Sequence, residues 1–309
     1  MENILKKSYR IDYIAKIKTE KPGIKIWLSK PINRNFQKIT DFFISLLPQS
    51  IYQDKYKNTI LYFDLPNNKE IQLNISIKVK NEFFNKKINP NLVKIPSKKS
   101  LIYKTQTTNV SFLEQTKNIK NLAYALKKNT KNAFEIAENA FLYTINNFQY
   151  KYPIEKRGMK NLNLQNLQGD CGEYSVFFAT VCRINRIPTK INTGFVVFSN
   201  NNSINEHSWN SIYLKPYGWL DVDTQYGSLE KNNKIALEKY FCKRIENRII
   251  FTENYNIPLK PPIIPGYNFS YWQKELMPIN KKEVQVLQPL IFATKYKLIS
   301  FKQNFELGY

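Results

Sequence analysis

A glycine-flanked cysteine at the start of a helical pattern is the feature that most constrains how this chain can fold. The cysteine is Cys171, in the run Gly169-Asp170-Cys171-Gly172-Glu173-Tyr174. Beyond it, large apolar side chains recur at the spacing of one helix face, namely Tyr174, Phe177, Phe178, Val181 and Cys182. We therefore predict a helix that buries this face and carries Cys171 in its first turn.

The start of a helix is a favourable place for a reactive cysteine. Its unpaired N–H groups and the positive end of its dipole favour an anion, so we expect a lowered pKa for the Cys171 thiol. The same N–H groups can donate hydrogen bonds to an oxyanion formed when a thiolate attacks a carbonyl. Gly169 and Gly172 leave room for a substrate backbone. The alternative is a buried structural cysteine, which is the commoner role of a single free cysteine.

A nucleophilic cysteine needs an imidazole base, and the chain contains one histidine, His207. It belongs to the run Glu206–Leu214, which we predict to be a strand joined by a hairpin turn to a second strand, Trp219–Asp223. We expect His207 and Asp223 to lie level across this antiparallel pair. Asp223 can then accept an imidazole N–H and fix the tautomer, while Asp221, on the same strand face, is the alternative.

The composition narrows the class of protein. The three cysteines are an odd number without Cys-x-x-Cys spacing, which argues against a disulfide framework, and a single histidine excludes a histidine-rich zinc site. The N-terminus lacks the apolar run of a signal peptide, and no apolar stretch is long enough to span a bilayer. We therefore expect a cytoplasmic protein in which Cys171 stays a thiol, with no metal and no organic cofactor.

The formal net charge is +23, from 47 Lys and Arg residues against 24 Asp and Glu residues. Such a charge fits nucleic acid or an anionic surface as a partner. The lysines are scattered as pairs, however, and they do not interleave with aromatic residues in a nucleic-acid motif. We therefore attribute the charge to a general bias in composition and do not expect nucleic acid as a partner.

The character of the chain changes along its length and predicts three segments. Residues 1–104 contain alternating runs such as Ile71–Val79 and are expected to form a β-rich domain ending in a linker, with a short helix at 41–47. Residues 105–254 form the segment that holds Cys171 and His207. Residues 255–309 are rich in proline at their start, and we expect them to wrap the core in extended form.

Taken together, these runs resemble the core of the transglutaminase-like superfamily, which has a papain-like thiol-enzyme fold. The matching parts follow in the family's order, with Cys171 at a helix start, then His207-Ser208-Trp209, then Gly218-Trp219-Leu220-Asp221-Val222-Asp223. The resemblance covers residues 118–227 and implies an α+β fold, with the nucleophile helix packed on an antiparallel sheet. The preceding β-rich segment is similar to the N-terminal domain of many bacterial members.

The resemblance implies that Cys171 is the nucleophile, His207 the base and acid, and Asp223 the group that orients the imidazole. It implies acyl transfer from a protein or peptide amide through a thioester, resolved by water in a hydrolase or by an amine in a transglutaminase. Hydrolysis is favoured because water is always available. Thr224 stands where the family often has proline, so Asp221 stays open as the alternative acid.

Two further points stay open at the level of sequence. The second oxyanion donor is expected from a side chain before the cysteine, and Gln168 and Gln165 are the candidates. The chain has no acidic loop for the calcium that some animal relatives use.

The alternative function is a non-catalytic peptide- or polyanion-binding protein that keeps the fold. The oligomeric state cannot be derived from the sequence.

Overall fold

A computed structural model describes residues 5–83, 88–154, 156–198, 203–231, 235–245, 247–270, 282–287 and 289–308. By their contacts, the residues divide into two compact units. The helical unit comprises residues 1–3, 84–192 and 208–246, and the β unit comprises residues 4–83, 193–207 and 247–309. The dividing lines fall inside two strands, β9 (Thr189–Phe198) and β10 (Ser203–Leu214). Each of these strands therefore contributes residues to both units.

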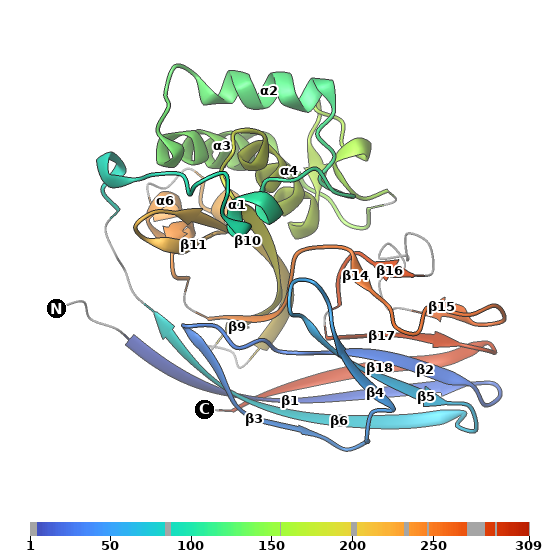
Figure 1. Ribbon diagram of the computed structural model, residues 1–309. Coiled ribbons are helices and arrows are strands. Elements are labelled where there is room, and N and C mark those ends of the chain that lie inside the picture. Colours follow the sequence, from blue (N-terminus) through green and yellow to red (C-terminus); the bar gives the residue numbers. More distant parts are fainter. Residues whose placement is uncertain are drawn as a thin grey trace. The chain divides into compact units, whose positions relative to one another are not determined.

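The helical unit is built around α4 (Cys171–Ile184), the helix predicted from the sequence. Residues 172 to 184 are all buried, so α4 is enclosed on every side and not on one face alone. Its neighbours are α2 (Lys117–Lys127), α3 (Ala133–Asn147) and α5 (Thr224–Leu229), of which α2 and α3 are drawn beside it in Figure 1. Shorter helical elements complete the unit: η1 (Pro90–Leu92), α1 (Leu101–Gln106), η2 (Met159–Asn161) and α6 (Ile235–Tyr240).

The predicted hairpin is present as β10 and β11 (Gly218–Val222), and β12 (Phe241–Lys243) pairs with β11 on its other side. The last pair in the β10–β11 register joins Asn210 to Val222. Continued by one residue, this register places Trp209 opposite Asp223. The expectation that His207 lies opposite Asp223 was therefore wrong by two residues along β10. The hairpin turn is centred on Pro216, whereas that pairing requires a turn centred on Lys215.

A short parallel pair fixes the chain just before the cysteine helix. Strand β7 (Gln149–Tyr150) pairs with β8 (Gln168–Gly169), and the register places Tyr150 beside Gly169. The Lys151 N–H also donates to the Gly169 carbonyl at 3.0 Å. The end of α3 is thereby tied to the residues that lead into α4.

The β unit contains two sheets whose inner faces share one core. In the first sheet the order is β18 (Leu298–Gly308), β1 (Leu5–Thr19), β6 (Glu70–Phe83) and β3 (Gln37–Ile44). In the second it is β15 (Asn268–Ser270), β17 (Leu290–Thr294), β2 (Ile24–Lys30), β5 (Thr59–Leu65) and β4 (Ser50–Gln53). Strand β13 (Arg248–Glu253) pairs beside β9, and β14 (Ile257–Pro258) pairs with β16 (Glu283–Val284).

The alternating runs of the sequence explain this core. Ile11 pairs with Ile77 and Tyr13 with Ile75 across β1 and β6, and their side chains are buried. They pack with apolar residues of β2, β5 and β17, while lysines and asparagines alternate with them on the outer face. Figure 1 shows β1, β6 and β18 running side by side.

Two expectations for this part of the chain were wrong. The helix expected at 41–47 is strand β3 as far as Ile44, because pairing of Phe42 with Ile77 on β6 outweighs the local helical spacing. The described part of residues 255–309 does not wrap the core in extended form, since β17 pairs with β2 and β18 pairs with β1 along most of its length. The stacking of Phe305 on Tyr13, with ring centroids 4.7 Å apart, anchors this last strand.

Candidate active site

Cys171 is the first residue of α4, as the sequence predicts. Asp170 is the N-cap, and its Oδ1 accepts the Gly172 N–H at 2.8 Å, which is the interaction that favours aspartate at this position. The Cys171 side chain is half-buried, whereas Cys182 and Cys242 are buried. Of the three cysteines, Cys171 is therefore the most exposed.

The surroundings of Cys171 raise the pKa of its thiol above the ordinary value, contrary to our expectation. Burial is the largest cause, and the carboxylates of Asp170 and Glu173 act in the same direction. A hydrogen bond from the Ser208 backbone N–H and the charge of Arg157 lower the thiol pKa, but by less. The helix start does not dominate, because Asp170 already occupies the Gly172 N–H group.

His207 lies on β10, directly before the residue whose N–H group reaches the Cys171 thiol. Its side chain is 3% exposed, so the imidazole is buried and not turned towards solvent. In the division of the chain, His207 is the last residue of the β unit on this strand and Ser208 is the first of the helical unit. His207 and Ser208 are thus consecutive residues of one continuous strand, β10.

Asp223 directly follows β11 and is fully buried. It is the N-cap of α5, where its Oδ1 accepts the Tyr226 N–H at 3.0 Å. The end of a strand and the start of a helix thus hold the carboxylate in a fixed position. The family pattern often has proline after this aspartate, and Thr224 fills that place here as the first residue of α5.

Asp221, the alternative acid, is bound to a different partner. It is 2% exposed, and its two oxygens lie 3.1 and 3.0 Å from Nη1 of Arg244. Its Oδ1 also accepts the Ser211 hydroxyl at 2.7 Å, and Ser211 accepts an amide N–H of Asn192 at 2.7 Å. Asp221 therefore compensates the charge of a buried arginine.

The two glutamines proposed as oxyanion donors lie on the chain that leads to β8 and α4. The Gln168 amide donates to Asn166 Oδ1 at 3.3 Å. Gln165 is exposed and lines a surface hollow together with Met159, Lys160 and Asn163. These positions do not single out either glutamine.

Sequence reasoning missed Tyr150, which β7 sets beside Gly169. Its side chain is 58% exposed, and burial of its hydroxyl followed by the charges of Cys171 and Asp170 raises the pKa of the phenol. The tyrosine hydroxyl thus lies within electrostatic reach of the thiol. No local pattern marks it, because its place near Cys171 depends on the β7–β8 pairing.

Sequence reasoning also missed Arg157, in the loop before η2. Its guanidinium donates to both oxygens of Asp170, at 2.9 and 2.5 Å, and to Oε2 of Glu173 at 2.6 Å. A lone arginine in a lysine-rich loop gives no signal of this kind. The contacts place one cation and two carboxyl groups around the first turn of α4.

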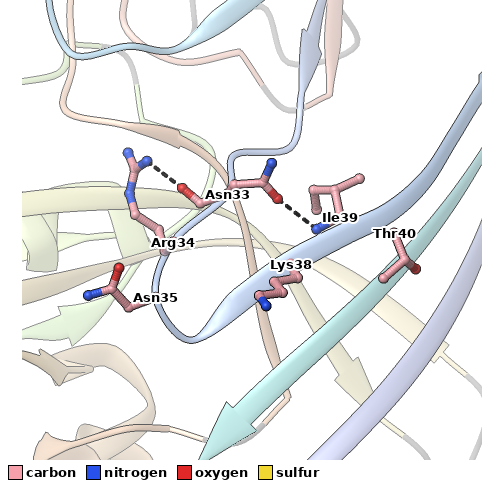
Figure 2. Close-up of a pocket in the computed structure, with 6 residues that line it drawn as sticks. All are labelled: Asn33, Arg34, Asn35, Lys38, Ile39 and Thr40. Atoms are coloured by element: carbon pink, nitrogen blue, oxygen red, sulfur yellow. Dashed lines mark hydrogen bonds between the residues drawn. The ribbon is translucent and has the colours of Figure 1, made fainter.

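The described part of the chain contains no cluster of three or more His, Cys, Asp or Glu residues arranged to hold a metal ion. Among its helices, none combines the length and apolar character needed to cross a membrane. A surface hollow in the β unit lies among Asn33, Arg34, Asn35, Lys38, Ile39 and Thr40 (Figure 2). In this hollow Arg34 is paired with Glu253 at 2.8 Å, and the Asn33 amide oxygen accepts the Ile39 N–H. None of the six lining residues is a candidate site residue.

Comparison with known proteins supports the resemblance seen in the sequence. Residues 120–224 match the sequence model of the Transglutaminase-like superfamily. The fold is similar to a crystal structure described as "a Putative Cysteine Protease" from Cytophaga hutchinsonii, with a TM-score of 0.63, 10% identity, and coverage of 98% of this chain and 92% of that one. At this identity the likeness concerns the fold alone. No curated protein gives a significant match.

A weaker similarity links the chain to the periplasmic domain of TgpA from Pseudomonas aeruginosa. The TM-score is 0.39, with 14% identity over 70% of each chain, and we draw no argument from it. The sequence match and the shared fold support a transglutaminase-like core, and the α+β fold class is confirmed. The chain therefore contains a segment, residues 120–224, that matches the transglutaminase-like superfamily.

Proposed function

We propose that this protein is a cysteine-dependent enzyme that transfers an acyl group from a protein or peptide amide, with Cys171 as nucleophile, His207 as base and acid, and Asp223 as the group that orients the imidazole. The observation that carries the proposal is the position of Cys171, the half-buried first residue of α4, within the segment that matches the superfamily. The single histidine of the chain, on β10, lies in the same segment.

The raised thiol pKa makes a base essential to this chemistry. A thiol whose pKa is raised by its surroundings does not ionise at neutral pH by itself, so the proton has to move to a neighbouring imidazole. The resulting imidazolium then stabilises the thiolate as an ion pair. Asp223 is proposed to accept the other imidazole N–H, and its fixed position between β11 and α5 suits that task.

In the first half of the proposed reaction, the Cys171 thiolate attacks the amide carbonyl carbon. The carbon–nitrogen bond breaks as the His207 imidazolium gives its proton to the leaving amine, and a thioester remains on Cys171. The N–H of Cys171 itself is the proposed donor to the oxyanion, because the Gly172 N–H is already bonded to Asp170. In the second half, His207 takes a proton from water or an amine that attacks the thioester, and the thiolate returns.

We favour water as the attacking group, so that the enzyme is a peptidase or amidase. The choice can be tested by incubating the protein with a peptide library that offers backbone and glutamine amides, with and without a primary amine. Mass spectrometry should find an acyl adduct on Cys171, and Cys171→Ala should abolish both the adduct and turnover. Hydrolysed products in the presence of excess amine support a hydrolase, whereas amine-linked products identify a transglutaminase.

The alternative is a binding protein that keeps the fold without catalysis, and the raised pKa of the Cys171 thiol is the observation that favours it. Such a protein should bind a peptide or a polyanion equally well as the wild type and as Cys171→Ala. Absence of any Cys171 adduct across the library, together with salt-dependent retention on a polyanion column, would replace the enzymatic proposal with this one.

A further inference from the structure

The first turn of α4 contains more acid than base. The side chains of Arg157, Asp170 and Glu173 are 4%, 10% and 1% exposed, and Arg157 contacts both carboxyl groups. If both acids were ionised, one guanidinium would face two negative charges, and the cluster would carry a net charge of about −1 in a buried place. An uncompensated buried charge is costly, so one carboxyl group should keep its proton.

The contacts indicate which acid holds that proton. Asp170 accepts two hydrogen bonds from Arg157 and one from the Gly172 N–H, all of which favour its ionised form. Glu173 accepts one hydrogen bond from Arg157, through Oε2. Burial, and then the charge of Asp170, raise the pKa of Glu173 to about 8, whereas the hydrogen bonds and charge of Arg157 outweigh burial and lower the pKa of Asp170.

We propose that Arg157, Asp170 and Glu173 form a positioning cluster in which the two acids share one proton, so that no net negative charge stands beside Cys171 when it forms its thiolate. Asp170 and Glu173 flank Cys171 in the chain, and both carboxylates disfavour an ionised thiol. A proton on Glu173 removes one of these charges while Arg157 compensates the other. The inference rests on the proposed role of Cys171 as nucleophile.

The groups that act on the cluster come from several elements. Arg157 comes from the loop before η2, and Lys160 on η2 is exposed. Burial, and then the charges of Cys171 and Asp170, raise the pKa of Tyr150 on β7, and the charge of Arg157 lowers it. The Gly158 N–H faces the Glu173 carboxyl group. Gly169 of β8 packs closely against the Glu173 side chain, since a Cβ added to Gly169 would overlap it. Glu173 therefore has little room to turn away from Cys171 when it loses its proton.

The test compares alkylation of Cys171 by iodoacetamide in the wild type and in Glu173→Gln. The glutamine amide oxygen can accept a hydrogen bond from Arg157, as the Glu173 carboxyl group does, but glutamine cannot ionise. The rate constant of the variant divided by that of the wild type should rise by roughly fivefold to tenfold between about pH 6.5 and about pH 9, as the wild type gains a charge near the thiol. Glu138→Gln, on α3 of the same unit, is the matched control, and its ratio should stay constant with pH.

A ratio for Glu173→Gln that does not change with pH overturns the inference, because Glu173 would then not titrate in connection with Cys171. The outcome is separate from the proposed function, which fails if Cys171 reacts no faster than a buried thiol. A second measurement covers a variant that does not fold. In wild-type protein with 13C-labelled glutamate carboxyl groups, the assigned carboxyl signal of Glu173 should titrate near pH 8, and alkylation of Cys171 should shift that titration. An unshifted titration contradicts the inference.

Discussion

Nη1 of Arg244 lies 3.1 and 3.0 Å from the two carboxylate oxygens of Asp221, and both side chains are buried. Because of this pair, we expect Asp221→Asn to act on stability more than on chemistry. The variant leaves the charge of Arg244 without its carboxylate, which should lower the free energy of unfolding by about 3 to 5 kcal/mol. Urea denaturation measures this loss. Wild-type stability in the variant would show that the pair does not hold the fold.

Asp223→Asn should have the opposite effect. Asparagine is as good an N-cap as aspartate, so it can still accept the Tyr226 N–H and preserve the start of α5. It cannot carry the charge that stabilises an imidazolium, and turnover should fall by roughly three to four orders of magnitude, as in other triads. Steady-state kinetics on a substrate from the peptide library measures this. If Asp221→Asn is the inactive variant while Asp223→Asn retains its rate, Asp221 is the orienting acid.

The three cysteines should differ in reactivity according to their exposure. Cys171 is half-buried at a helix start, whereas Cys182 lies within α4 and Cys242 within β12, both buried. Mass-spectrometric mapping after short exposure to iodoacetamide should therefore find the label on Cys171 first, with the other two labelled only on unfolding. Equal labelling of all three in the folded protein would remove the basis for the nucleophile.

Gly169 should not tolerate a side chain. A Cβ at this position would overlap Cβ and Cγ of Glu173, so Gly169→Ala has to displace the first turn of α4. We expect a loss of about 1 to 3 kcal/mol in the free energy of unfolding, as for other overpacked sites. Gly308→Ala is the control, because its Cβ would meet Arg10 at an ordinary contact distance. Thermal denaturation that finds equal effects for both variants would contradict this close fit.

Features of the fold that depend on local spacing could be predicted from the sequence. The helix that begins at Cys171, the hairpin of β10 and β11, and the strands that contain Tyr13 and Ile75 all follow from apolar periodicity. The family resemblance followed from the order of short motifs, and the comparisons confirm it. These features depend on residues that are close together in the chain, so a single sequence is enough to find them.

Features that depend on distant partners could not be predicted. Strand β18 pairs with β1 from the other end of the chain, so its place in the sheet depends on a partner about 300 residues away in sequence. The thiol pKa of Cys171 depends on burial and on Arg157, which reaches the site from a loop with no motif. The register of β10 and β11 likewise depends on the turn between them. Asp223 was therefore predicted to lie opposite His207, two residues from the position that the register gives.

The pH dependence of Cys171 alkylation in the wild type and in His207→Gln tests the proposed catalytic pair most directly. With an imidazole to take the proton, the wild type should react at about neutral pH, whereas the variant should react roughly 100-fold more slowly there, because its thiol has to ionise unaided. The two profiles should converge only above the ordinary pKa of a cysteine. Superimposable profiles for a folded variant would show that His207 does not activate Cys171, and the proposed thiol chemistry would fail.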